Sequence, residues 1–126
     1  KTGDENAIKH AVMLSKRAWI QMNLARSVGG ATTVPTRIQV IRLGSVAFVG
    51  TPVEAFAEVG LAIKEASPAR QTIFAGYANE SFGYMPMAGD YEIGGYEPRT
   101  TPFHAGSGEQ MIAECGEVLE ELWADG

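Results

Sequence analysis

The chain has 126 residues, a net charge of −5 and an apolar content of 45%. This length suits one domain, with a core that removes roughly two thirds of the unfolded surface from water. The acidic balance and the absence of a Lys/Arg cluster argue against nucleic-acid binding through phosphates. No apolar run approaches the about 20 residues that a membrane-spanning helix needs. Because the chain starts at Lys1 rather than at methionine, we expect a single domain or a fragment of a longer protein.

The hydrophobic pattern predicts an α/β fold. Apolar spacing of the helical kind predicts helices over residues 4–26, 53–66 and 109–123, and short apolar runs predict strands over residues 38–43, 46–49 and 71–78. Gly44-Ser45 suits a two-residue hairpin turn, and the helix between the last two strands suits a right-handed parallel crossover. We therefore expect a small mixed sheet in which a β-hairpin leads into a βαβ unit, flanked by long N- and C-terminal helices.

Residues 79–108 lack a regular pattern but are rich in aromatic side chains. Disordered segments are poor in aromatics, so we expect an ordered, functional loop. Gly106-Ser107-Gly108, at its end, is either an anion-binding turn or a helix start capped by Ser107 or Gly108, and we favour the cap. Cys115, the only cysteine, falls within an apolar helical stripe and is predicted to be a buried structural thiol.

Glu54 lies where the apolar run Val46–Val49 ends and the next helix is expected to begin. The carboxyl end of a strand is where open α/β sheets place their ligands. An acid in a first helical turn is also favoured by the helix dipole alone. Both interpretations stay open from the spacing.

Tyr84 follows the next predicted strand, so a parallel pairing would bring it to the same sheet edge as Glu54. A carboxylate and a phenol can both bind a metal, and a phenol can hydrogen-bond an oxyanion. His10 and His104 are the only imidazoles; His10 suits a surface or half-buried position, and His104 lies where binding is possible. Neither completes a closed zinc site, which needs further His or Cys ligands.

Several blocks in this order resemble the neutral/alkaline non-lysosomal ceramidase family and its shorter bacterial relatives. They are residues 38–44, residues 46–54, Ala78-Asn79, residues 83–86 and residues 91–97. The resemblance covers about residues 37–110 and implies the C-terminal part of the catalytic region. In that family the strand is followed by Pro-Gly-Glu, whereas this chain has Pro52-Val53-Glu54.

The resemblance implies zinc as the cofactor, Glu54 and Tyr84 as metal ligands, and Tyr84 also as a catalytic residue. The family's two histidine ligands and its serine nucleophile have no counterpart here. It therefore implies the C-terminal portion of a zinc-dependent amide hydrolase that is inactive alone. Its partner would be the remainder of the parent protein or its N-terminal portion, and a homo-oligomer is also possible.

Two alternatives remain. The chain could be a non-catalytic structural or assembly domain that keeps the family scaffold. It could instead be a small-ligand binder that uses the loop aromatics and the Gly106-Ser107-Gly108 turn. Substitution of Glu54 and Tyr84 separates the first alternative from the hydrolase hypothesis, and a ligand screen by thermal shift detects the second.

Overall fold

The computed structural model describes residues 35–124, together with Glu5, Thr33 and residues 7–9, 11, 12, 14, 15 and 18. The described residues of the predicted N-terminal helix, from Glu5 to Ala18, are helical. An exposed i,i+4 ion pair joins Glu5 to Lys9 across 3.0 Å. The rest of that helix, with His10, lies outside the described residues.

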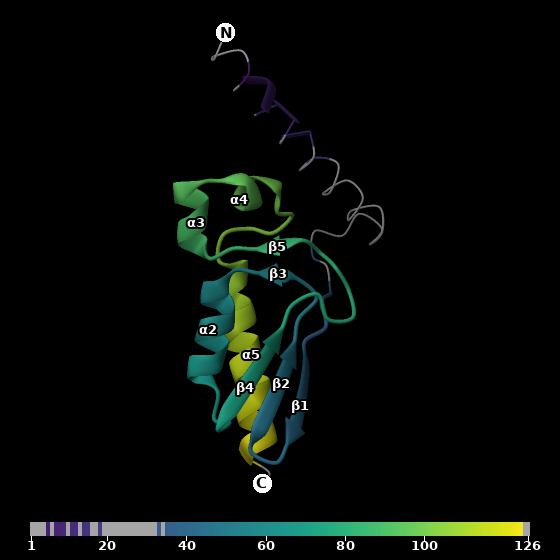
Figure 1. Ribbon diagram of the computed structural model, residues 1–126, viewed down its shortest axis with the longest axis vertical. Helices are drawn as coiled ribbons and strands as arrows, with labels where there is room; N and C mark the ends of the chain where they lie inside the picture. The colour runs from purple at the N-terminus through teal and green to yellow at the C-terminus, as the bar shows by residue number, and fades with distance from the viewer. Residues whose placement is uncertain are drawn as a thin grey trace.

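The fold is a mixed α/β arrangement, as predicted (Figure 1). Its elements are β1 (Gln39–Leu43), β2 (Val46–Gly50), β3 (Glu54–Ala55), α2 (Ala57–Ala66), β4 (Gln71–Ala75), β5 (Tyr84–Met85), α3 (Ala88–Ile93), α4 (Tyr96–Thr100) and α5 (Ser107–Ala124). The strands form a three-stranded sheet in the order β1-β2-β4 and a two-stranded sheet that pairs β3 with β5.

The three-stranded sheet contains both predicted motifs. β1 and β2 pair antiparallel as a hairpin whose turn is Gly44-Ser45, and Gly44 has the positive φ of 60° that favours glycine in such turns. β2 and β4 pair in parallel, with α2 in the connection between them. The hairpin leading into a βαβ unit is thus confirmed.

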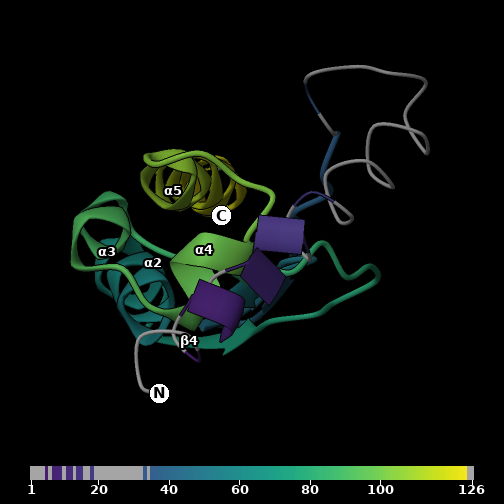
Figure 2. The ribbon, with the colours of Figure 1, turned by 90° about the horizontal axis from the view of Figure 1, so that it is seen from above.

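Helices α2 and α5 cover one face of this sheet (Figure 2). The core between them contains Ala47 and Val49 from β2, Val59 and Ile63 from α2, and Met111, Cys115 and Leu119 from α5. Cys115 is fully buried, as predicted. None of the described helices is long and apolar enough to cross a membrane.

Arg42 joins β1 to the end of α5. Its guanidinium donates a hydrogen bond to the Leu122 carbonyl at 2.7 Å and lies over the Trp123 ring, 4.7 Å from the ring centroid. A cation is favoured at a helix C-terminus by the helix dipole and over an indole ring by the cation–π interaction. This contact closes the end of the molecule opposite to the two-stranded sheet (Figure 1).

The predicted start of the second helix at Val53 is wrong. The helix begins at Ala57, and Glu54 lies in strand β3. The Glu54 N–H donates to the Gly83 carbonyl at 2.9 Å, and the Phe56 N–H donates to the Met85 carbonyl at 3.0 Å. Pairing with a distant segment therefore keeps these residues extended, and Glu54 is not a first-turn acid stabilised by the helix dipole.

The region after β4 also differs from the prediction. The strand ends at Ala75 rather than at Ala78, and residues 79–108 are not one irregular loop. They contain β5, α3 and α4, each six residues long or shorter. The predicted C-terminal helix is present, but Ser107 is already its first residue.

Candidate functional site

Glu54 and Tyr84 are direct partners in the parallel pairing of β3 with β5. The two residues come from segments that continue β2 and β4 beyond the end of the three-stranded sheet (Figure 1). Glu54 is exposed and Tyr84 is half-buried. The structure thus brings together the two residues that the sequence analysis placed at one sheet edge.

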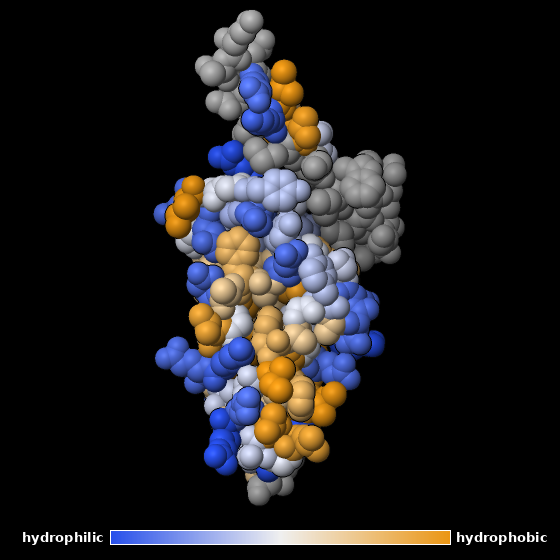
Figure 3. Space-filling model, viewed as in Figure 1, coloured by the Kyte–Doolittle hydropathy of each residue, from blue (hydrophilic) through white to orange (hydrophobic). Residues whose placement is uncertain are grey.

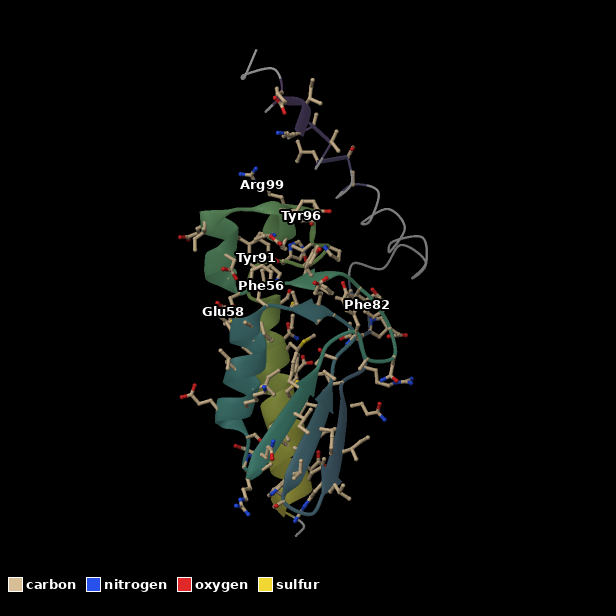
Figure 4. All side chains as sticks on the ribbon, in the orientation of Figure 1. Phe56, Glu58, Phe82, Tyr91, Tyr96 and Arg99 are labelled. Carbon is tan, nitrogen blue, oxygen red and sulfur yellow. The ribbon has the colours of Figure 1, made fainter. Side chains whose placement is uncertain are left out.

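A loop between β4 and β5 holds the pair in register. Its backbone follows residues 51–53: the Ala78 N–H donates to the Thr51 carbonyl at 2.9 Å, and the Phe82 N–H donates to the Pro52 carbonyl at 2.9 Å. The side chain of Phe82 packs against the core, on the loop at the far side of the molecule from α3 (Figure 4). These contacts attach the loop to residues 51–53 and place Tyr84 opposite Glu54.

Gly76 allows the backbone of this loop to lie very close to the backbone of Val53. A Cβ atom at this position would lie 2.9 Å from the Val53 carbonyl oxygen, which is shorter than a non-bonded carbon–oxygen contact allows. The next residue, Tyr77, donates its N–H to the same carbonyl at 3.0 Å and has a positive φ of 54°. That conformation is uncommon for a residue other than glycine, asparagine or aspartate.

Tyr77 belongs to the site, although the sequence analysis did not identify it. Its hydroxyl donates a hydrogen bond to the Glu54 Oε2 atom, with 2.5 Å between the oxygens. This hydrogen bond, followed by partial burial and the Glu54 charge, raises the pKa of Tyr77 to about 12. The protonated phenol therefore anchors one oxygen of the carboxylate.

Tyr84 is held by its backbone and its ring. The buried Thr101 hydroxyl donates to the Tyr84 carbonyl at 2.6 Å and accepts from the Phe103 N–H at 3.1 Å. The Tyr84 ring meets Tyr96 of α4 edge to face, with 6.0 Å between centroids. The negative charge of Glu54 is the main cause that raises the pKa of Tyr84 above its ordinary value.

Aromatic side chains of α3 and α4 lie at this same end of the molecule. Figure 4 places Tyr91 and Tyr96 there, with Phe56 beneath Tyr91. The Tyr91 hydroxyl donates to the Phe103 carbonyl at 3.0 Å. The short helices α3 and α4 thus form part of the environment of Tyr84. They are too short to show a helical hydrophobic period, so the only signal for them in the sequence was the aromatic content of this region.

The other candidates lie elsewhere or act differently. His104 is exposed, and no group of three or more His, Cys, Asp or Glu side chains suited to a metal occurs in the described part of the chain. Asn79 donates its side-chain N–H to the Gln39 Oε1 atom at 3.0 Å, which ties it to β1. Ser107 and Gly108 are the first two residues of α5 itself, so neither of them precedes the helix as the predicted cap would; Gly106 does.

The Gly106-Ser107-Gly108 turn packs against protein at its last residue, whereas Gly106 and Ser107 are half-buried. Gly108 is buried, and a Cβ atom there would lie 2.7 Å from the Pro86 carbonyl oxygen. The Gly106 carbonyl accepts from the Gln110 N–H at 3.0 Å, which is the first hydrogen bond of the helix. The turn starts α5 and packs its first residues against the segment after β5.

The fold of part of this chain resembles that of a class of hydrolases, the ceramidases. Two solved structures share the fold: a ceramidase complexed with C2, with a TM-score of 0.55, and the neutral ceramidase from Pseudomonas aeruginosa, with a TM-score of 0.54. Each is 26% identical to this chain, and each match covers 67% of it. No family model and no curated protein matches the chain.

The matched region is a small part of each ceramidase. It covers 15% of the length of either solved chain. This chain therefore has a ceramidase-like fold that corresponds to a fragment of those larger proteins.

Proposed function

We propose that this chain is the C-terminal portion of a zinc-dependent amide hydrolase of the neutral ceramidase type and contributes part of its metal site. The observation that carries the proposal is the direct pairing of Glu54 with Tyr84 across β3 and β5. Placement of Glu54 in a strand removes the helix-dipole explanation for an acid at this position. The ceramidase-like fold of the matched region supports the same assignment.

The side chains fit the proposed group. Glutamate oxygen is an ordinary zinc ligand, and a phenolic oxygen beside it adds a second donor. Tyr77 occupies only the Oε2 atom of Glu54, and Glu54 is exposed at the edge of the structure. When bound, zinc would polarise the carbonyl of the scissile amide. The Tyr84 hydroxyl would either hold the metal or donate a hydrogen bond to the developing oxyanion.

Two ligands are not a complete site. Zinc in proteins takes about four ligands, commonly with two or more from His or Cys. The described residues offer no cluster of three such groups, so the remaining ligands and the nucleophile would come from another part of the parent protein. We expect the isolated chain to bind zinc weakly and to lack hydrolase activity.

The test uses the full-length protein that contains this sequence. We expect it to hydrolyse an N-acyl sphingosine in detergent micelles, and we expect Glu54→Gln and Tyr84→Phe each to reduce kcat/KM by at least about a hundredfold. Glu58→Gln is the matched control, because Glu58 is also exposed but lies in the first turn of α2. Unchanged activity in the Glu54→Gln variant would overturn the proposal.

A second candidate function is a non-catalytic assembly domain that retains the ceramidase scaffold. The observation that favours it is Val53, which is fully buried where the resembled family has glycine beside its glutamate ligand. Glu54 would then be an exposed acid held by Tyr77. Unchanged activity of the full-length protein in both the Glu54→Gln and the Tyr84→Phe variants would favour this second function.

A further inference from the structure

The sheet face opposite to α2 and α5 carries a cluster of apolar side chains. We call this cluster the outer face; it consists of Ile41, Leu43, Val46, Phe48 and Ile73, and Gln39 and Gln71 lie on the same side of the sheet beside it. The strand registers align Ile41 with Phe48 and Phe48 with Ile73, so three large apolar side chains form one row across all three strands. Leu43 and Val46 are paired beside this row.

Four of these side chains are exposed to solvent in the described structure, and Val46 is half-buried. Ile41 is 54% exposed, Phe48 39% and Ile73 41%. Figure 3 shows the resulting cluster of hydrophobic side chains over the strands in the lower half of the view, where no described element lies in front of the sheet. Scattered single apolar residues on a surface are ordinary, whereas a contiguous apolar patch indicates an interface.

The pattern of β2 explains why a cover is needed. An antiparallel strand with one wet face alternates apolar and polar side chains, and a strand buried on both faces is apolar throughout. In β2 the side chains of Ala47 and Val49 enter the core, while Val46 and Phe48 point to the outer face. The sequence of β2 is therefore that of a strand with protein on both sides, and the described chain supplies protein on one side only.

We propose that the outer face is covered by an apolar layer of the larger ceramidase-like polypeptide from which this chain derives. This inference rests on the proposed function for the identity of the parent. The length of chain outside the matched region supports the choice of occupant, because 85% of each matched ceramidase lies outside it. β2 is followed by β3 after residues 51–53, and β4 by β5 after the loop of residues 76–83, so a layer over this end of the sheet would lie near Glu54 and Tyr84.

Two measurements on the full-length protein test this proposal. The first is thiol labelling of Ile41→Cys and Ile73→Cys, read by mass spectrometry of the peptide that carries each position. Leu61→Cys on α2 is the matched control, since Leu61 is 62% exposed and lies away from the outer face. We expect the two outer-face positions to react at least about tenfold more slowly than the control, because reaction then requires local opening.

The second measurement identifies the occupant. A photo-reactive benzoylphenylalanine replaces Phe48, and the cross-linked peptide is sequenced. A peptide from outside the 126 residues supports the proposal. A peptide from within them, whether from the same molecule or from a second copy, overturns it, as do equal labelling rates at all three positions.

The test of the outer face can fail or succeed independently of the test of the proposed hydrolase function. Labelling and cross-linking do not require bound metal, so they are repeated in the Glu54→Gln background. A covered outer face in a protein that never binds zinc would retain this inference and reject the hydrolase. A protein that contains zinc and is active but has an exposed outer face would support the hydrolase and reject this inference.

Discussion

The Tyr77 hydroxyl donates a hydrogen bond to the carboxylate of Glu54 at 2.5 Å, across a gap of 23 positions in the chain. Tyr77 thereby fixes the side chain that we propose as a metal ligand. The contact depends on backbone geometry, because Tyr77 takes a positive φ directly after the close approach at Gly76. It is the least expected feature of the site.

The first prediction concerns tyrosine ionisation in the metal-free chain. The hydrogen bond to Glu54 raises the pKa of Tyr77 to about 12, so its stabilising contribution is complete below pH about 10 and is lost as the pH rises towards 12. The Glu54 charge also raises the pKa of Tyr84. In Glu54→Gln we expect two of the four tyrosines to ionise at lower pH, measured by phenolate absorbance. An unchanged titration curve would refute this, and Glu58→Gln is the control.

The second prediction tests the close approach at Gly76. A methyl group there would meet the Val53 carbonyl oxygen at 2.9 Å, so we expect Gly76→Ala to lower the free energy of unfolding by roughly 1–3 kcal/mol. Gly89→Ala is the control, because nothing lies within 4 Å of its Cβ position and Gly89 is in helix α3. Urea denaturation measures both, and equal stabilities would contradict the geometry.

The third prediction compares two fully buried threonines. The Thr101 hydroxyl bonds the Tyr84 carbonyl and the Phe103 N–H, and Thr101→Val leaves both unpaired at a cost of about 1–3 kcal/mol. The Thr51 hydroxyl has no partner among the described residues, so Thr51→Val should cost nothing or stabilise the fold. Thermal unfolding of the two variants should therefore diverge, and a larger loss for Thr51→Val would show that its hydroxyl is bonded.

The fourth prediction concerns Cys115. Burial, with a smaller contribution from the Glu114 charge, raises the pKa of its thiol to about 12. Because the thiolate is the reactive form, we expect very slow reaction with a disulfide reagent at neutral pH and rapid reaction in denaturant. Cys115 is the only cysteine of the chain, so the signal has one source. Rapid labelling of the native chain would contradict its burial.

The hairpin and the βαβ unit could be predicted from the sequence because local patterns specify them. Short apolar runs, a Gly44-Ser45 turn and one helical stripe were sufficient. The start of α2 was not predictable in the same way. An acid after proline is typical of a first helical turn, but hydrogen bonds to Gly83 and Met85 keep residues 54–55 extended.

The candidate site was predictable only in part. The placement of Glu54 and Tyr84 after two parallel strands followed from topology, and the structure pairs them directly. Tyr77 was assigned to a strand that in fact ends at Ala75, and no local pattern signals its left-handed backbone. The short helices α3 and α4 contain too few turns for a period to be read.

The zinc content of the full-length protein tests the central claim most directly. Metal is measured by elemental analysis after exhaustive dialysis, for the unmodified protein and for its Glu54→Gln, Tyr84→Phe and Glu58→Gln variants. We expect about one zinc per chain in the unmodified protein and in Glu58→Gln, and at least about a tenfold loss of affinity in the other two. Zinc bound equally tightly by all four proteins, or by none of them, would contradict a metal site built on Glu54 and Tyr84.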